Sequence, residues 1–433
     1  MTDFCCMPEK KVQGEICVPG DKSISHRFVI FSSIAEGKSC ARNMLTGEDC
    51  LTTISAFRTM GVTINLSGTS CEIVGVGKYG LKQPEAPLFL GNSGTTMRLL
   101  TGLLAGQKFN VILEGDSSLS KRPMDRVVLP LREMKAQITG EGDAICPPLS
   151  ITGQSLQPIV HNERLGSAQV KSSILLAGLY SKGATTVIEE RRSRDHTEKM
   201  LEWYGAQFEK KGNSLTIHGS STLNAVGEDI IIPGDISSAA FFIVAALIIP
   251  GSALVIKNVC LNPTRIGILT ILKEMGANIE IKNHKKNGEP CGDIVVKYSQ
   301  LKGVTVKHEN LSFLIDEIPI LMVACALAEG KSCIEDASEL RVKETDRIES
   351  MTKGLIGLGA DISVDGDTIY INGKKSLKGD VAVMSCDDHR TAMSLIVAGL
   401  ASEKPVTVKD IDCMSISYPN FINDLAYCLG EAK

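Results

Sequence analysis

The sequence lacks the features that mark nucleic-acid and membrane proteins. Its 46 lysines and arginines are outnumbered by 50 acidic residues, which gives a formal charge of −4, whereas a nucleic-acid binder usually carries a basic excess. The longest apolar run, residues 239–249, is much shorter than the about 20 residues that a membrane-spanning helix needs. We therefore expect no nucleic-acid partner and no membrane partner, and any anion-binding site must be local.

Signatures of metal binding and secretion are also missing. The fourteen cysteines are scattered, without a C-x-x-C pair or a Cys/His spacing typical of zinc. The N-terminal stretch MTDFCCMPEKK contains no apolar segment of the kind found in a signal peptide. Free thiols within apolar stretches are typical of proteins in a reducing compartment. We therefore expect a soluble, cytoplasmic protein without a metal site.

What the sequence does contain is one pentapeptide that recurs along the chain. Its pattern is an apolar residue, two small residues, a polar residue and a second apolar residue. Because the spacing of the copies exceeds the period of common solenoids, each repeat must be a small fold of several elements. The copies are MGVTI at 60–64, the less strict MKAQI at 134–138, YGAQF at 204–208, MGANI at 275–279, LGADI at 358–362, and LG at 429–430, where a sixth copy begins.

Each repeat follows one order of predicted elements. A helix of small and apolar residues ends near a glycine, and it is followed by a β-like run, a polar loop, a second amphipathic helix and the pentapeptide with its strand. The hexapeptide AEGKSC occurs at 35–40 and again at 328–333, which supports duplication. Its GKS could suggest a nucleotide-binding P-loop, but Ser32 and Cys325 stand where that motif needs its first glycine.

Two similar tetrapeptides, VPGD at 18–21 and IPGD at 232–235, divide the repeats into two groups of three. Each combines a β-like residue, a rigid proline, a permissive glycine and a potential N-cap, which suits a joint between a strand and a helix. The β-like segment 11–18 has no repeat of its own, and we expect it to complete the sixth repeat. The sequence thus predicts an α/β (α+β) fold of two similar domains, residues 1–19 with 235–433 and residues 20–234, joined by two hinge strands.

Charged residues gather where the helices are predicted to begin. Helix N-termini attract anions, and arginine suits phosphate and carboxylate groups. Taken singly, these residues would be solvated surface charges or helix caps, but their recurrence at the same joint of most repeats indicates small, multiply anionic substrates in a cleft between the domains. The strings are GDKSISHR (20–27), GNSGTTMR (91–98), KRP (121–123), SAQVK (167–171), RDHTE (194–198), DE (316–317), RVKETDR (341–347) and DDHR (387–390).

With these strings assembled, the chain resembles the EPSP synthase family, the 3-phosphoshikimate 1-carboxyvinyltransferases, over nearly its whole length. The combination of GNSGT and RVKETDR is highly specific, and GDKS, SAQVK, RDHTE and NPTR (262–265) resemble the second, glyphosate-tolerant class of the family. The resemblance implies two domains, each a pseudo-threefold arrangement of three helix-and-sheet repeats. It also implies that no metal or organic cofactor is used, and we expect a monomer.

The resemblance implies the reaction as well. The family moves the enolpyruvyl group of phosphoenolpyruvate to the 5-hydroxyl of shikimate-3-phosphate by addition and elimination, with release of phosphate, in the shikimate pathway to chorismate and the aromatic amino acids. The hydroxyl must lose a proton while the methylene carbon gains one, so the reaction needs a base and an acid. As in the family, Asp316 is the expected base, and Glu344 is the expected proton donor, with Lys22 as an alternative or partner.

The substrate-binding residues follow from the same resemblance. Ile416 stands where many relatives carry a further lysine, so one phosphoenolpyruvate contact is missing or supplied elsewhere. The residues expected to bind shikimate-3-phosphate are Lys22, Ser23, Arg27, Ser167, Ala168, Gln169, Arg194, Asp316 and Lys343. Those expected to bind phosphoenolpyruvate are Lys22, Asn92, Gly94, Thr95, Arg122, Gln169, Lys171, Glu344, Arg347 and Arg390.

Two other functions stay open at this point. The sister enzyme transfers the same group to UDP-N-acetylglucosamine, but it normally has a reactive cysteine on a mobile loop, and the equivalent residues 115–123 contain none. A non-catalytic repeat scaffold that binds partner proteins is the other alternative. Aromatic residues, which favour interaction surfaces, make up only 4% of the chain, and this low content argues against a scaffold.

Overall fold

The computed structural model describes residues 2–8, 11–285 and 288–431, and the chain divides into two compact units. We call Met1–Pro19 with Pro233–Lys433 domain I, and Gly20–Ile232 domain II. The two breaks fall within the VPGD and IPGD tetrapeptides, so the chain starts in domain I, forms domain II, and returns to domain I.

Domain II consists of three sheets and the helices that connect their strands. In two of the sheets, two parallel strands flank a helix in sequence, whereas in the third the parallel partner of β3 is β14, the last strand of the domain. In each sheet an antiparallel hairpin pairs with one of the two parallel strands. The sheet orders are β14 (Gly227–Ile231), β3 (Glu36–Arg42), β5 (Ser70–Val76), β4 (Thr63–Ser67); β6 (Leu88–Phe89), β7 (Asn110–Glu114), β9 (Cys146–Thr152), β8 (Gln137–Glu141); and β10 (Val160–Glu163), β11 (Ala184–Glu189), β13 (Ser214–His218), β12 (Phe208–Lys211).

Domain I repeats this plan. Two of its sheets have the same four-strand order, and the third has three strands in the part of the chain that the structure describes. The orders are β2 (Gln13–Ile16), β15 (Ala253–Cys260), β17 (Cys291–Lys297), β16 (Asn278–Lys285); β18 (Thr305–Val306), β19 (Lys331–Ile334), β21 (Thr368–Asn372), β20 (Asp361–Asp365); and β22 (Val381–Met384), β23 (Val406–Lys409), β1 (Phe4–Cys6).

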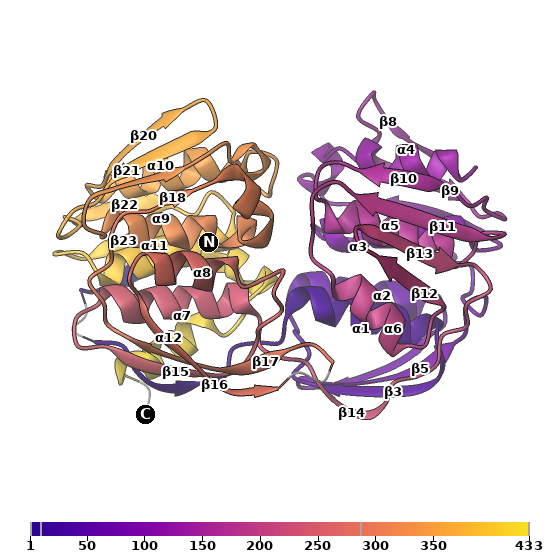
Figure 1. Ribbon diagram of the computed structural model, residues 1–433, viewed down its shortest axis with the longest axis horizontal. Coiled ribbons are helices and arrows are strands. Elements are labelled where there is room, and N and C mark those ends of the chain that lie inside the picture. Colours follow the sequence, from indigo (N-terminus) through magenta and orange to yellow (C-terminus); the bar gives the residue numbers. More distant parts are fainter. Residues whose placement is uncertain (1, 9–10, 286–287, 432–433) are drawn as a thin grey trace. The chain divides into compact units, whose positions relative to one another are not determined.

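The first helix of every repeat is buried, and in Figure 1 the helices of each domain lie inside its sheets. Because these helices are apolar or small on nearly all faces, they bury their whole circumference rather than one stripe. In domain II they are α1 (Lys22–Ile34), α3 (Gly94–Ala105) and α5 (Ala168–Gly178), and in domain I they are α7 (Ile236–Ile248), α9 (Ile318–Ala326) and α11 (His389–Leu400). The apolar run at 239–249 is therefore mostly the buried helix α7.

The second helix of each repeat is amphipathic, and the repeated pentapeptide closes it. Its glycine takes a left-handed backbone conformation at Gly61, Gly205, Gly276, Gly359 and Gly430, where a side chain would be strained. At the less strict copy Lys135 adopts the same conformation, with φ of 69°. These helices are α2 (Glu48–Thr59), α4 (Asp125–Glu133), α6 (His196–Trp203), α8 (Gly267–Glu274), α10 (Arg347–Gly357) and α12 (Phe421–Leu429).

The two AEGKSC copies do not form nucleotide-binding loops. The lysine, serine and cysteine of each AEGKSC copy lie in strands, β3 and β19, so neither copy forms the loop before a helix that a P-loop requires.

Short 3-10 turns complete the repeats. They are η1 (Leu119–Lys121), η2 (His308–Phe313), η3 (Ile315–Glu317), η4 (Ser338–Leu340) and η5 (Ile411–Ile416).

The expectation that segment 11–18 completes the sixth repeat is wrong. Strand β2 from this segment pairs in parallel with β15 of the fourth repeat, and it is β1, only three residues long, that pairs with β23 of the sixth repeat. Each crossing strand therefore stays with the domain that it leaves: β2 precedes α1 of domain II, and β14 precedes α7 of domain I. At the first crossing a side chain on Gly20 would lie 1.8 Å from the Asn43 carbonyl oxygen, so only glycine fits.

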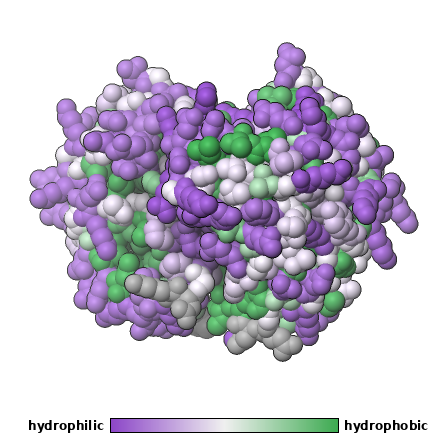
Figure 2. Space-filling model, turned by 45° about the vertical axis from the view of Figure 1, so that its right-hand side comes forward, coloured by the Kyte–Doolittle hydropathy of each residue, from purple (hydrophilic) through white to green (hydrophobic). Residues whose placement is uncertain are grey.

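Within the described ranges, no helix is both long and apolar enough to cross a bilayer. The face in Figure 2 is largely hydrophilic, with hydrophobic side chains in separate patches.

Candidate active site

The first helices of domain II begin with polar caps that leave charged or hydroxyl side chains at the N-terminus. The Asp21 carboxylate accepts a hydrogen bond from the Ile24 amide at 3.0 Å, and Ser93 and Ser167 cap α3 and α5 through their hydroxyls. Such ends carry unpaired N–H groups and partial positive charge, which attract anions. The GDKS, GNSGT and SAQ strings thus occupy three helix starts of one domain.

A polar cluster joins the starts of α3 and α5. The side-chain oxygen of Gln169 accepts from Nη1 of Arg98 at 2.9 Å, and its nitrogen donates to the Thr95 hydroxyl at 3.0 Å. Arg122 donates to the side-chain oxygen of Asn92. Four residues predicted for phosphoenolpyruvate (Asn92, Thr95, Arg122, Gln169) therefore lie in two hydrogen-bonded groups at these helix starts. Gly94 lies close to both groups, because a β-carbon on it would come within 2.9 Å of the Arg98 guanidinium and 3.3 Å of the Arg122 guanidinium.

Arg98 was missed as a site residue, although it ends the GNSGTTMR string. It lies four residues after Gly94, and residues at this spacing share one face of a helix. A helical projection of the string would have placed its guanidinium beside the predicted loop.

Arg27 and Lys22 lie on α1, as predicted, and both have protein partners. Nε of Arg27 donates to the Thr197 hydroxyl at 2.6 Å, and its Nη2 donates to the Ser172 hydroxyl at 2.8 Å. Nη1 donates to the Ser23 carbonyl oxygen at 3.1 Å. Lys22 pairs with the Asp49 carboxylate at 3.1 Å and stays partly exposed. Arg27 therefore ties α1 to α5 and α6 in addition to any substrate contact.

The other residues predicted for shikimate-3-phosphate in domain II lie at the start of α5 and before α6. Ser167 is the N-cap of α5 and Ala168 its first residue. The Glu163 carboxylate accepts from the Ser167 amide at 3.0 Å, which fixes the chain just before the helix. Arg194 is half-buried in the loop that leads to α6.

Lys171 lies in a place that sequence reasoning did not anticipate. Its side chain has no exposed surface, and Nζ pairs with Glu189 at 2.9 Å and Glu198 at 2.6 Å. Burial raises the pKa of the Glu198 carboxyl, although Lys171 opposes this shift. Because the ammonium is enclosed by two carboxylates, the structure argues against the predicted contact between Lys171 and phosphoenolpyruvate.

In domain I a buried arginine brings two predicted catalytic carboxylates together. Arg347, 1% exposed, donates from Nη2 to Glu344 at 2.6 Å and from Nη1 to Asp316 at 3.3 Å. Its Nε donates to Asp388 at 2.8 Å. Burial lowers the pKa of the Arg347 guanidinium, but the carboxylates, Asp388 foremost, outweigh this effect and hold the pKa above its usual value.

Arg390 completes this group at the start of α11. Its Nη1 donates to the Asp316 carbonyl oxygen at 3.1 Å, and its Nε lies 3.9 Å from the Asp316 carboxylate. Asp388, the N-cap of α11, accepts from the Arg390 and Thr391 amides at 2.9 Å. Lys343 is half-buried in the turn between η4 and α10. Domain I thus brings three carboxylates and two arginines together near the start of α11.

A buried chain of hydroxyls beneath the α3 start was also missed. His26 Nδ1 lies 2.7 Å from the Thr53 hydroxyl, which lies 2.7 Å from that of Thr96, and Thr96 lies 2.7 Å from the Ser93 hydroxyl. Burial, then the charges of Lys22 and Arg27, holds the pKa of His26 well below its usual value. A neutral histidine thus supports the cap of α3. These residues come from three helices, so no local motif reveals the chain.

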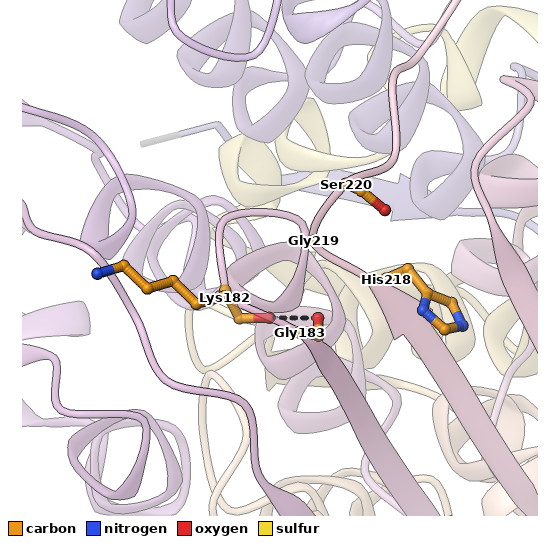
Figure 3. A pocket seen from close by; sticks show the side chains of 6 residues that line it. Lys182, Gly183, His218, Gly219 and Ser220 are labelled. Atoms are coloured by element: carbon orange, nitrogen blue, oxygen red, sulfur yellow. Dashed lines mark hydrogen bonds between the residues drawn. The ribbon is translucent and has the colours of Figure 1, made fainter.

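A surface hollow in domain II does not belong to this set. It is lined by residues that follow α5 and β13, and in Figure 3 the Lys182 and His218 side chains point in different directions. Its one drawn hydrogen bond joins the Ser181 hydroxyl to the Gly183 carbonyl oxygen at 3.0 Å. The hollow lies beyond the C-terminus of α5, the opposite end from Ser167 and about 16 Å away along an 11-residue helix. Among the described residues, no group of three or more His, Cys, Asp or Glu side chains is placed to hold a metal ion.

Comparison with known proteins decides the family. A family model described as EPSP synthase (3-phosphoshikimate 1-carboxyvinyltransferase) matches residues 6–425. The chain belongs to this family. A 3-phosphoshikimate 1-carboxyvinyltransferase of Syntrophotalea carbinolica is 50% identical over 416 residues, 96% of each chain. One of Bacillus pumilus is 48% identical over 96% of this chain and 97% of the relative.

A solved structure agrees with this membership of the EPSP synthase family. The EPSP synthase of Acinetobacter baumannii matches with a TM-score of 0.88 and 44% identity, over 99% of this chain and 98% of the other. The predicted α/β fold and the predicted enzymatic activity, enolpyruvyl transfer in the shikimate pathway, are thereby confirmed. Neither the UDP-N-acetylglucosamine enzyme nor a scaffold is favoured.

Proposed function

We propose that the two domains divide the work of the transferase. Domain II would supply most of the contacts to the anionic substrates, and domain I would supply the acid and the base together with further binding contacts from Arg347, Arg390 and Lys343. The proposal requires both sets of residues to act on the same pair of substrates. The observation that carries it is the contrast between the caps and basic side chains at the helix starts of domain II and the two carboxylates held by Arg347 in domain I.

Shikimate-3-phosphate is proposed to bind at the starts of α1 and α5. Ser167 and Arg194 would contact its phosphate, because a capped helix start and a guanidinium both favour a dianion. Further contacts would come from Lys22, Ser23, Arg27, Ala168, Gln169, Asp316 and Lys343. Arg27 donates one hydrogen bond from each guanidinium nitrogen to the protein, including one to the Ser23 carbonyl oxygen, and this fixes its guanidinium at the α1 start.

Phosphoenolpyruvate is proposed to bind where two arginine groups meet its carboxylate and phosphate. Arg122, Gln169 and the α3 start with Asn92, Gly94 and Thr95 would hold one end. Arg347, Arg390 and Lys22 would hold the other. Arginine matches both anionic groups through paired N–H donors, which is the reason that these residue types suit the substrate.

The proton transfers are assigned to the carboxylates of domain I. Asp316 would take the proton from the 5-hydroxyl of shikimate-3-phosphate as that oxygen attacks the enol carbon. Glu344 would give a proton to the methylene carbon, with Lys22 as an alternative or partner. Glu344 is paired with Arg347 here at 2.6 Å, so we propose that an anionic substrate group replaces it at the guanidinium and frees it to carry a proton. A base in the second step would take that proton back as phosphate leaves.

A coupled phosphate-release assay tests this proposal. The purified chain with shikimate-3-phosphate and phosphoenolpyruvate should release phosphate, and omission of either substrate should abolish the release. UDP-N-acetylglucosamine in place of shikimate-3-phosphate is the matched control acceptor. Turnover with this control alone would contradict the proposal.

The family subclass, the oligomeric state and the cellular compartment are part of the same proposal. The GDKS, SAQVK, RDHTE and NPTR strings support membership of the second class, and we propose glyphosate tolerance on that basis. A steady-state titration of glyphosate against phosphoenolpyruvate tests it, and competitive inhibition at concentrations far below the KM of phosphoenolpyruvate would contradict it. We also propose a cytoplasmic monomer, which light scattering coupled to size-exclusion chromatography and cell fractionation would test.

A further inference from the structure

Two sequence strings meet through a buried ion pair in domain II. SAQVK ends at Lys171 in α5, and RDHTE ends at Glu198 in α6. The Lys171 ammonium lies 2.6 Å from Glu198 and 2.9 Å from Glu189, the last residue of β11. We call these three residues the α5 triad. It joins three consecutive elements of the third repeat at one point.

The α5 triad is expensive to bury. The side chains of Lys171, Glu189 and Glu198 are 0%, 9% and 3% exposed, and a buried ion pair is often no more stabilising than apolar residues of the same volume. One carboxylate oxygen of Glu198, Oε2, has no hydrogen-bond partner, which adds to the cost. If the triad served only stability, leucine and methionine in its place would be buried at a lower cost in free energy.

The α5 triad also fixes the loop that carries Arg194. Glu189 accepts hydrogen bonds from the Ser193 amide at 3.0 Å and from the Ser193 hydroxyl at 2.5 Å. The residue after Ser193 is Arg194, and Glu198 lies in the first turn of the helix that follows. Because both ends of this loop are held by Lys171, its position relative to α5 is set by charge.

The α5 triad is connected through α5 itself to the start of that helix. Ser167, its N-cap, lies one turn before Lys171 on the same helix. A second link runs in parallel, since the Ser172 and Thr197 hydroxyls lie 2.6 Å apart and both accept from Arg27. The ionic and hydroxyl links leave little freedom between the α5 start and the segment that carries Arg194.

We propose that the α5 triad is a positioning device that holds Arg194 at the correct distance from Ser167, and so determines the affinity for the phosphate of shikimate-3-phosphate. The inference rests on the proposed function, because it assigns the phosphate to this corner of domain II. Lys171, Glu189 and Glu198 act through Arg194 and Ser167 and do not touch the substrate. This role replaces the contact with phosphoenolpyruvate that the sequence predicted for Lys171.

Steady-state kinetics of Lys171→Met, Glu189→Gln and Glu198→Gln test the proposal. A displacement of about 1 Å can change rates or affinities by about a hundredfold, so we expect the KM for shikimate-3-phosphate to rise about tenfold or more. The KM for phosphoenolpyruvate should stay within about twofold, because all of its proposed contacts except Gln169 lie outside α5 and α6. The matched control is Tyr204→Phe, which removes another buried hydrogen bond of α6, 2.6 Å long, to the Ser32 hydroxyl.

A second variant separates positioning from stability. Lys171→Met combined with Glu198→Leu removes one charge of each sign and restores apolar packing, so the melting temperature should recover toward that of the wild type. The raised KM for shikimate-3-phosphate should persist, because Arg194 has lost its ionic anchor. Trp203, the one tryptophan of the chain, lies in α6 and reports folding of this region by fluorescence. If Lys171→Met does not fold, the double variant and Glu198→Gln decide the question.

Two results would overturn the inference. One is an unchanged KM for shikimate-3-phosphate in folded triad variants. The other is a uniform loss in all kinetic parameters that tracks melting temperature, as in Tyr204→Phe. If the wild type itself releases no phosphate, the proposed function fails instead, so the two failures are distinguishable.

Discussion

The two domains share one repeat and one fold plan, yet they cap the first helices of their repeats differently. In domain II two of the three caps are serines, and in domain I all three cap positions hold carboxylates. A hydroxyl cap leaves the positive end of a helix available to an anion, whereas a carboxylate cap neutralises that end. The cap residues are Asp21, Ser93 and Ser167 in domain II, and Asp235, Glu317 and Asp388 in domain I.

The arginines of the two domains differ in the same sense. In domain I, Arg265 and Arg347 are almost fully buried and pair with the cap carboxylates Asp235 and Asp388 at 3.0 and 2.8 Å. In domain II, Arg98 and Arg122 are only half-buried and donate to neutral side chains. The two domains thus share the geometry of the helix start and differ in the charge placed on it, as the proposed binding and acid–base roles require.

The largest expected effect comes from removing the proposed acid of domain I. Glu344→Gln keeps the side-chain shape and an acceptor for Arg347 but cannot donate a carboxyl proton, and general acid catalysis is worth about a hundredfold to ten-thousandfold. We expect kcat to fall by that factor with an unchanged circular dichroism spectrum. The matched control is Glu349→Gln, an exposed carboxylate in the first turn of α10, the helix that follows Glu344. Near-native turnover by the Glu344 variant would leave Lys22 as the donor.

The next effect concerns the stability of domain I. Arg347→Met would leave the fully buried carboxylate of Asp388 without its cation, and breaking a buried pair in this way costs about 3–5 kcal/mol. Urea unfolding followed by circular dichroism measures the loss. The control Lys353→Met removes an exposed partner of Glu349 on the same helix and should change stability little. If both variants lose the same free energy of unfolding, the buried ion pairs of Arg347 do not stabilise the start of α11.

The buried histidine of domain II should make the stability of the protein sensitive to acid. The folded-state pKa of His26 in domain II lies well below its unfolded value, so below about pH 6.5 the unfolded chain binds a proton that the folded chain does not. Stability should therefore fall with decreasing pH, by up to about 1.4 kcal/mol per pH unit. In His26→Asn, which keeps a partner for Thr53, this slope should be absent. Denaturant unfolding between pH 5 and 7, read by Trp203 in domain II, measures both slopes, and identical slopes would contradict the burial of a neutral histidine.

The smallest expected effect concerns the residue of each pentapeptide copy that takes the left-handed backbone conformation. Lys135 adopts the left-handed conformation that glycine takes in the other five copies, at a cost of about 1 kcal/mol. Lys135→Gly in domain II should raise the free energy of unfolding by roughly this amount. In domain I, Gly276→Ala should lower it by about the same, because the only atom within 4 Å of the new β-carbon lies 3.9 Å away, so strain rather than a clash decides. Thermal unfolding of the two variants compares them, and two shifts of the same sign would contradict this reading.

The repeats and the helix starts could be predicted from the sequence because both depend on local signals. The pentapeptide glycines close helices wherever they occur, and Asp21, Ser93 and Ser167 cap helices as their residue types suggest. The pairing of β1 could not be predicted, since three residues, FCC, carry no alternating pattern and the choice of partner strand is a tertiary matter.

The position of Lys171 could not be predicted for a related reason. Helix α5 is buried on nearly every side, so its sequence gives no polar face to which a lysine would be assigned. Its partners Glu189 and Glu198 come from a strand and from another helix, 18 and 27 residues further along the chain. The motif therefore led to a predicted contact with phosphoenolpyruvate, and only the packed structure gives the surroundings of Lys171.

The division of labour between the domains is tested most directly by a paired measurement of Arg122→Gln and Asp316→Ala in the phosphate-release assay. The account predicts that Arg122→Gln raises the KM for phosphoenolpyruvate about tenfold or more with a smaller change in kcat. It predicts that Asp316→Ala lowers kcat about a hundredfold or more and leaves that KM within a few-fold. If both variants change the same parameter to the same extent, the assignment of binding to domain II and of proton transfer to domain I is wrong.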